Sequence, residues 1–190
     1  MNVKLVVGLA GMPGAGKSVV VRVAKALGYN ILVMGDVVRE ESRKRGLELN
    51  PENLGNVMLK LRQEEGPAVI AKRCISRIRQ AKGEKIIIDG VRSLEEVEEF
   101  QQHFSHFALL SIHASPEKRF KRLHHRRRSD DPESLATFNK RDLRELNVGL
   151  GKAIAMAEYV ILNEKDLDAV KERAKKVLER IEAKWMKQKK

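Results

Sequence analysis

Gly11-Met12-Pro13-Gly14-Ala15-Gly16-Lys17-Ser18 is the stretch that decides the fold, because it satisfies the pattern G-x-x-x-x-G-K-[ST] at every fixed position. It follows an apolar run, Lys4–Leu9, and it opens a helical pattern that continues to Leu27. Glycines allow a tight turn that points successive backbone N–H groups inward around a phosphate. The following helix adds the positive end of its dipole. The eight residues therefore predict a cradle for the phosphates of a nucleoside triphosphate.

Two further side chains are expected to complete this phosphate site with a metal ion. Lys17 is expected to reach the outer phosphates, and the Ser18 hydroxyl is suited to coordinate Mg²⁺. Asp89 ends the apolar run Lys85–Asp89, which predicts a carboxylate at the carboxyl end of a buried strand, where ligands bind in open α/β sheets. We expect Ser18 and Asp89 to hold Mg²⁺ or one of its waters.

Short apolar runs predict the strands of one sheet: Lys4–Leu9, Ile31–Met34, Lys85–Asp89, Phe107–His113 and Tyr159–Leu162. They are continuous rather than alternating, as expected when helices cover both faces of a sheet. Strands that alternate with helical patterns imply right-handed crossovers and a mostly parallel sheet. The expected fold class is therefore α/β: a three-layer P-loop nucleoside-triphosphate-hydrolase fold, with a five-stranded parallel sheet and helices on both faces.

Capping residues, prolines and glycines also predict where helices begin and end. Asn50 followed by Pro51 predicts a capped helix start, and Ser93 with Glu96 predicts a capping box. Asp131-Pro132 is expected to open a further helix, which we expect to close at the glycines of the segment Gly149-Leu150-Gly151.

The length of the chain, 190 residues, corresponds to a single domain. Two stretches are additional to a simple alternation of strands and helices. They are a polar helical insertion at residues 37–65 and a basic insertion at residues 119–148. We interpret both as subdomains on one core formed by residues 1–36, 66–118 and 149–190.

The composition excludes some classes of protein and favours anionic partners. The 38 Lys and Arg residues against 26 Asp and Glu residues give a formal charge of +12. One cysteine, Cys74, excludes an intramolecular disulfide framework and fits a reducing compartment. No stretch approaches the roughly 18 apolar residues of a membrane span, and we find no signal peptide. We therefore expect a cytoplasmic protein.

Beyond the phosphate cradle, three local patterns resemble the P-loop nucleotide kinases of the adenylate kinase and dephospho-coenzyme A kinase kind. They are Gly35-Asp36-Val37-Val38-Arg39, Asp89-Gly90-Val91-Arg92 and Arg122-Leu123-His124-His125-Arg126-Arg127. The second pattern lacks the usual proline before the arginine and is one residue shorter. The segments 141–146, 149–151 and 157–164 resemble more closely an archaeal, adenylate-kinase-related family of P-loop proteins.

The resemblance implies a nucleotide-kinase subtype of the fold and assigns roles to arginines. Arg39 and Arg92 would bind the phosphate of an acceptor from the insertion at residues 37–65 and its surroundings, with Asp36 orienting a hydroxyl group. In the basic insertion, which would be a lid, Arg122 would pack on the base of ATP. Arg126 and Arg141 are the best candidates for phosphate contacts, because planar guanidinium groups bind phosphate oxygens in pairs.

A mobile cationic cover also follows from the chemistry of phosphoryl transfer, which needs charge neutralisation and exclusion of water. Basic side chains crowd the required segment: Lys118, Arg119, Lys121, Arg122, Arg126, Arg127 and Arg128. The favoured hypothesis is a Mg²⁺-dependent kinase that moves the γ-phosphoryl group of ATP to a nucleoside monophosphate or a dephospho-coenzyme A-like acceptor, with Lys17, Asp89, Arg126 and Arg141 as the catalytic residues.

Two alternatives remain open at this point. The positive charge also fits an RNA-associated ATPase or a polynucleotide kinase, with weak nucleic-acid binding, although aromatic residues make up only 4% of the chain and stacking platforms are scarce. A regulatory ATP-binding protein with a vestigial second site is the third hypothesis. The sequence allows a monomer or a homodimer and leaves the base preference open.

Overall fold

The computed structural model describes residues 4–126 and 131–188, and its centre is a five-stranded sheet in which every neighbouring pair is parallel. The strand order is β2-β3-β1-β4-β5. The strands are β1 (Leu5–Ala10), β2 (Asn30–Val33), β3 (Lys85–Val91), β4 (His106–His113) and β5 (Tyr159–Leu162). The chain leaves β1 toward β2 and β3 on one side and returns to β4 and β5 on the other. The carboxyl end of β1 is therefore the switch point at which open α/β sheets bind ligands.

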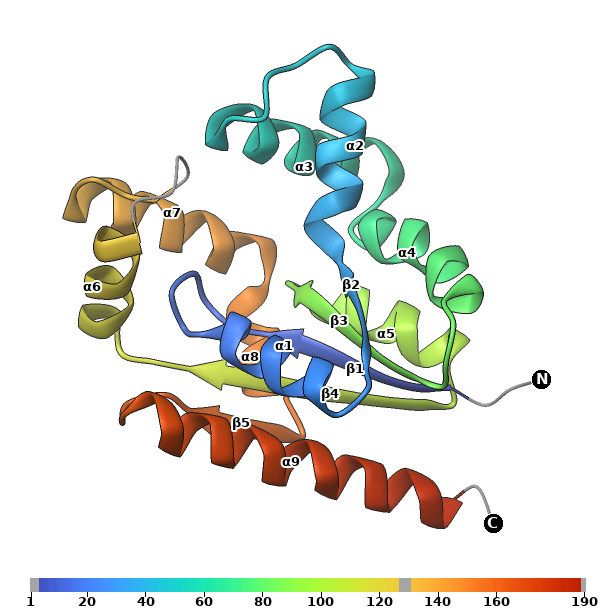
Figure 1. Cartoon of the computed structure of the whole chain (residues 1–190). Coiled ribbons are helices and arrows are strands. Elements are labelled where there is room, and N and C mark those ends of the chain that lie inside the picture. The colour runs from blue at the N-terminus through green and yellow to red at the C-terminus, as the bar shows by residue number, and fades with distance from the viewer. Residues whose placement is uncertain (1–3, 127–130, 189–190) are drawn as a thin grey trace.

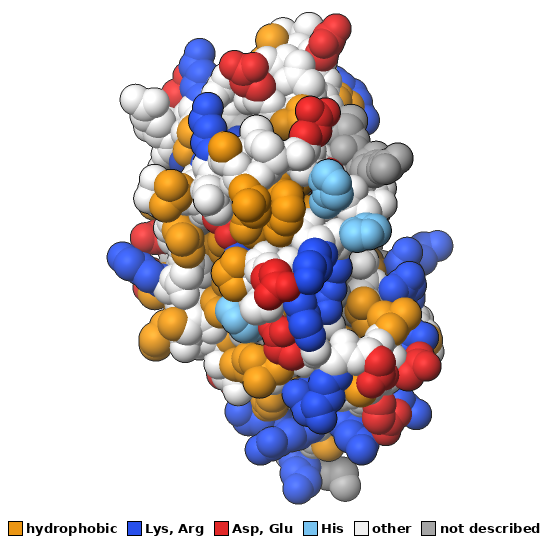
Figure 2. Space-filling view, turned by 90° about the vertical axis from the view of Figure 1, so that its left-hand side faces the viewer, with side chains coloured by type: hydrophobic (Ala, Val, Ile, Leu, Met, Phe, Trp, Pro, Cys, Tyr) orange, Lys and Arg blue, Asp and Glu red, His pale blue; other side chains and the backbone are white. Residues whose placement is uncertain are grey.

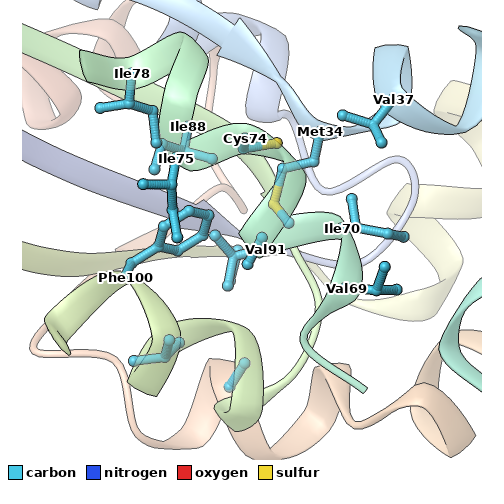
Figure 3. Packing of buried hydrophobic residues seen from close by; sticks show 14 of the residues in the cluster. Met34, Val37, Val69, Ile70, Cys74, Ile75, Ile78, Ile88, Val91 and Phe100 are labelled. Carbon is cyan, nitrogen blue, oxygen red and sulfur yellow. The ribbon is translucent and has the colours of Figure 1, made fainter. Parts of the chain in front are cut away.

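Helices cover both faces of the sheet, so the predicted three-layer fold is confirmed (Figure 1). One face packs against α1 (Lys17–Ala26) and α9 (Leu167–Gln188), and the other against α4 (Val69–Gln80), α5 (Leu94–His103) and α8 (Leu150–Ala155). The central strands β1, β3 and β4 are mostly buried because each face of the sheet has its own hydrophobic core, whereas the edge strands β2 and β5 are only partly buried. Figure 3 shows the core under α4 and α5, where Ile75, Ile88 and Phe100 meet.

Four helices extend beyond these layers and correspond to the two predicted insertions. α2 (Met34–Lys44) and α3 (Pro51–Glu65) lie within or next to the insertion at residues 37–65, and α6 (Pro116–Arg126) and α7 (Leu135–Val148) belong mainly to the one at 119–148. Figure 1 shows α2 and α3 at the top of the molecule and α6 and α7 at its left. Asn50 caps α3 by accepting a hydrogen bond from the backbone N–H of Asn53, with Pro51 as the first helical residue, as predicted.

Some predicted boundaries are wrong. Met34 does not end the second strand but begins α2, so Asp36 lies inside the first helical turn. Asp131-Pro132 does not open a helix: α7 begins at Leu135, because Ser134 and Thr137 form a reciprocal capping box. Gly149 alone ends α7, in a left-handed conformation, and Gly151 lies inside α8.

Candidate active site

The phosphate loop connects β1 to α1 in the predicted place. Its turn is closed by a hydrogen bond of 3.0 Å from the backbone N–H of Ala15 to the carbonyl of Met12. Gly14 and Gly16 have φ angles of 79° and 107°, which side-chain-bearing residues rarely adopt. Both are also crowded: a Cβ on Gly16 would lie 2.1 Å from Asn163 Nδ2, and one on Gly14 would lie 2.8 Å from the Arg119 carbonyl. Glycine is therefore required at both positions for two independent reasons.

Lys17 and Ser18 begin the helix that follows the loop. Lys17 Nζ donates a hydrogen bond of 2.5 Å to the carbonyl of Gly11, so the amine folds back over the loop. Burial lowers the pKa of Lys17; the negative charge of Asp89 opposes this shift, and the positive charge of Arg92 adds to it. Ser18 is exposed in the first turn of α1, where its hydroxyl is open to a ligand.

Asp89 faces the loop from the neighbouring strand. It pairs in register with Leu9 of β1 and Val33 of β2, which sets its carboxylate beside the start of the phosphate loop. Burial raises the pKa of Asp89 above its ordinary value, and Lys17 opposes that shift most strongly. Its Oδ1 is buried and has no hydrogen-bond partner among the described residues. A buried carboxylate oxygen without a partner fits a Mg²⁺ ligand, because Mg²⁺ prefers oxygen donors.

Arg119 was grouped by sequence with the exposed cations of the lid, and the structure shows a different role. Its side chain is only 4% exposed and forms a two-pronged pair with Asp142 of α7, with distances of 2.9 and 2.5 Å. It also donates to the carbonyls of Ala114 and Pro13. Arg119 thus joins α6, α7 and the phosphate loop. The signal that could have found it is its spacing of four from the buried Leu123, which puts both residues on one helix face.

The other lid arginines are held by oxygen atoms of the chain. Arg122 Nη2 donates to the carbonyl and to Oδ1 of Asn163, at 2.9 and 3.0 Å, and Asn163 Nδ2 donates to the carbonyl of Ala15. Arg126 forms a two-pronged pair with the buried Asp131, which also lies 4.0 Å from Arg141. The side chains proposed for ATP phosphates thus meet at an internal carboxylate. Arg127 and Arg128 lie outside the described residues.

The residues predicted for an acceptor lie on the other side of Asp89. Arg39 pairs with Asp36 at 2.6 Å across one helical turn, and both side chains are about half exposed. Arg92 follows β3, where Gly90 has a φ angle of 107° and the pairing with β1 shifts by one residue. Arg92 Nε lies 3.3 Å from Oε2 of Glu145, a buried residue of α7 that sequence reasoning missed.

Lys17 is the point at which these groups meet. Asp89, Arg92, Glu145 and Arg141 all lie close enough to change its pKa, and Arg39 acts in turn on Asp89. The charges of Asp89, Arg92 and Arg141 therefore all act on Lys17, and the charge of Arg39 acts on Asp89. Asp131 links Arg126 to Arg141.

Two lysines of α6 form ion pairs with glutamates, which the sequence did not predict. Lys118 pairs with Glu164 at 3.3 Å, and Lys121 pairs with Glu117 at 2.6 Å. Figure 2, which views the molecule from the side of α6 and α7, shows acidic and hydrophobic side chains interrupting the basic ones. Within the part of the chain that is described, basic side chains gather at the lower end of this view and do not form one continuous surface over the face. In the part of the chain that is described, no helix is both long and apolar enough to span a bilayer.

This architecture and its phosphate loop define the class: the fold is that of the P-loop kinases. Among solved structures, TT1252 from Thermus thermophilus has a TM-score of 0.65 at 20% identity, covering 93% of this chain and 96% of that one. A shikimate kinase from Acinetobacter baumannii has a TM-score of 0.59 at 18% identity, covering 96% of each chain, and a gluconokinase from Sinorhizobium meliloti 1021 has 0.59 at 16%, covering 99% of each. At these identities the likeness shows the fold.

Relatives of higher sequence identity show which family the chain belongs to. A family profile described as AAA domain matches residues 10–139. The UPF0200 protein of Hyperthermus butylicus is 43% identical over 178 residues, which cover 94% of this chain and 95% of that protein. UPF0200 protein MJ1399 of Methanocaldococcus jannaschii is 48% identical over 166 residues, covering 86% and 84%. The chain belongs to the UPF0200 family, and the predicted membership of an archaeal family of P-loop proteins is confirmed.

Proposed function

We propose that this chain is a Mg²⁺-dependent phosphotransferase that moves the γ-phosphoryl group of ATP to a small, phosphate-bearing, nucleotide-like acceptor. The observation that carries the proposal is the phosphate loop with the buried, unpartnered Oδ1 of Asp89 on the neighbouring strand, and with Arg92 three residues further along, just after the end of that strand. A passive ATP-binding protein needs the loop and the carboxylate, but it has no need for Arg92 at this end of the sheet.

In this proposal Ser18 and Asp89 hold Mg²⁺, and the buried, unpartnered Oδ1 of Asp89 is the atom that fits it. When bound, Mg²⁺ neutralises charge on the phosphate oxygens. The backbone N–H groups of residues 11–18 cradle the phosphates, and the ammonium group of Lys17 exchanges the Gly11 carbonyl for a phosphate oxygen. Arg122 borders the base, and Arg126 and Arg141 exchange Asp131 for phosphate oxygens.

The chemical step needs positioning more than covalent catalysis. An oxygen of the acceptor attacks the γ-phosphorus, the bond to the β–γ bridging oxygen breaks, and ADP departs with that electron pair. An ionised phosphate oxygen has no proton to lose, whereas a hydroxyl group would give its proton to Asp36. Arg92 and Arg39 orient the acceptor, with Asp36 beside them, and the lid formed by residues 119–148 excludes water. Pairing of Arg119, Lys118 and Lys121 with carboxylates is the reason we favour this function over an RNA-binding one.

The test is a transfer assay with γ-labelled ATP, Mg²⁺ and a panel of nucleoside monophosphates together with dephospho-coenzyme A. We expect label on at least one acceptor at a rate well above that of hydrolysis, and loss of that product in Arg92→Ala. Release of label only as inorganic phosphate, with every acceptor and at the same rate in Arg92→Ala, would contradict the proposal. Titration of a single-stranded RNA between low and moderate salt distinguishes the nucleic-acid alternative, which requires a steep loss of affinity.

A further inference from the structure

Two arginines, Arg92 and Arg144, have guanidinium groups that form no hydrogen bond to a carboxylate or carbonyl within residues 4–126 and 131–188. Arg92 Nη1 points at the thioether sulfur of Met58, at 2.9 Å, and a thioether is a weak acceptor. Arg144 of α7 lies against Gly55 of α3, and its Nε is buried without a hydrogen-bond partner among the described residues. Arg119, by comparison, has carbonyl or carboxylate partners on all three nitrogens.

Both guanidinium groups meet the same face of α3. Gly55 and Met58 are three residues apart in that helix, so they are neighbours on its surface. Arg144 reaches this face only because residue 55 has no side chain: a Cβ there would lie 2.7 Å from its Nη1. Glycine in a helix interior lowers helix stability relative to alanine, so secondary structure does not explain why residue 55 is glycine. The close approach of the Arg144 guanidinium group explains it.

Glu145 is the group that now faces Arg92. It follows Arg144 on α7, is 4% exposed, and lies with Oε2 at 3.3 Å from Arg92 Nε, yet that oxygen accepts no hydrogen bond. A buried carboxylate that is near a guanidinium group but not bonded to it is a weak internal partner. An anion that can bond both arginines would take its place.

We propose that Arg92 and Arg144 form a two-arginine clamp for a phosphate monoester on the acceptor, that Gly55 admits Arg144 to this clamp, and that Glu145 faces Arg92 until the phosphate replaces it. This inference rests on the proposed function, because it describes the acceptor side of the same site. A phosphate fits better than a carboxylate, since its three terminal oxygens serve two guanidinium forks whereas the two oxygens of a carboxylate serve one.

The experiment is calorimetric titration with inorganic phosphate at constant ionic strength, with Mg²⁺ and a non-hydrolysable ATP analogue present to fill the phosphate loop. Gly55→Ala is the decisive variant, because its methyl group displaces the Arg144 guanidinium while the helix gains stability. We expect phosphate to bind about tenfold more weakly to Gly55→Ala and to Arg144→Ala, and severalfold more tightly to Glu145→Gln. Lys60→Ala, an exposed position on the same helix, serves as the matched control and leaves the affinity unchanged.

Thermal unfolding of the same variants separates this effect from damage to the fold: Gly55→Ala is expected to unfold at the wild-type temperature or above. Unchanged phosphate affinity in both Gly55→Ala and Arg144→Ala overturns the clamp. Equal affinity for acetate and phosphate overturns the choice of a phosphate monoester. If the analogue does not bind at all, the proposed function fails, and comparing Gly55→Ala with wild type without the analogue still tests the clamp.

Discussion

The helix α6 and the segment that follows β3 each contain an arginine, and the hydrogen-bonding groups of the two arginines are satisfied to different degrees. Arg119 of α6 is 4% exposed and is bonded to Asp142 and to two backbone carbonyls. The side chain of Arg92, which follows β3, is 34% exposed; it contacts the thioether of Met58 and lies near the carboxylate of Glu145 without a hydrogen bond to Oε2. A guanidinium group whose donors are all used holds the fold together. One whose donors are poorly used is available to a ligand.

The largest effect that tests this comparison is expected from Arg119→Ala. Removing one partner of a buried ion pair leaves the other charge uncompensated, which typically costs about 3–5 kcal/mol. For a chain of this length we expect the melting temperature to fall by about 10 °C. Denaturant unfolding measures the free energy directly.

Lys121→Ala is the control for Arg119→Ala, because it removes a lid cation whose partner is Glu117 on the surface. If Arg119→Ala lowers the free energy of unfolding by less than 1 kcal/mol, Arg119 does not join α6 to the phosphate loop. The distinction between Arg119 and Arg92 would then be wrong.

A smaller effect of opposite sign is expected from Asp89→Asn. Burial raises the pKa of Asp89, so the ionised carboxylate is less stable in the folded chain than in the unfolded one. Without ligand, the neutral amide should therefore stabilise the fold, while Mg²⁺-dependent activity is lost. Urea unfolding at neutral pH, alongside the transfer assay, measures both.

The pH dependence of Asp89→Asn gives a second readout. The folded protein binds more protons than the unfolded chain between the unfolded pKa of 3.8 and the raised pKa. The free energy of unfolding of wild type is therefore lower than that of Asp89→Asn by the full amount above the raised pKa, and this difference disappears as the pH falls to 3.8. A difference that grows toward acidic pH would contradict a desolvated carboxylate at this position.

The smallest effect is expected from Lys121→Ala itself. Exposed ion pairs at a helical spacing of four contribute little to stability, and salt screens them. The unfolding curves of wild type and Lys121→Ala should coincide at physiological salt. A clear destabilisation in Lys121→Ala would mean that the surface ion pairs of α6 also hold the fold together.

Much of the fold could be predicted from the sequence, because the decisive signals are local. The phosphate loop fixes the order of strand, turn and helix, and the run Tyr159–Leu162 coincides with β5. Errors arose where two local signals compete. Met34 is apolar and buried, so the run of hydrophobic residues could not distinguish the end of β2 from the start of α2. Asp131-Pro132 reads as a helix start, but the reciprocal cap formed by Ser134 and Thr137 fixes the start of α7.

The candidate site was predictable only where motifs carry it. Lys17 and Ser18 follow from the spacing of the phosphate-loop motif. Asp89 was predicted to end its strand, but β3 continues to Val91, so Asp89 lies two residues before the end. The partners of the arginines do not, because Arg119 and Asp142 are 23 residues apart and Arg92 and Glu145 are more than 50 apart. Whether a basic residue is buried and bonded or open to a ligand depends on such distant pairs. The contact of Gly55 with Arg144 is invisible to sequence patterns for the same reason.

We infer that residues 11–18 bind the phosphates of a nucleoside triphosphate together with Mg²⁺, and that Arg39 and Arg92 bind a second substrate beside them. Calorimetric titration of ATP into the purified chain, with and without Mg²⁺, tests it most directly. The account predicts one Mg²⁺-dependent site, weakened at least about tenfold in Lys17→Ala because a charge-assisted contact to phosphate is lost. The absence of any Mg²⁺-dependent binding of ATP or GTP, or equal affinity in Lys17→Ala and wild type, would contradict it.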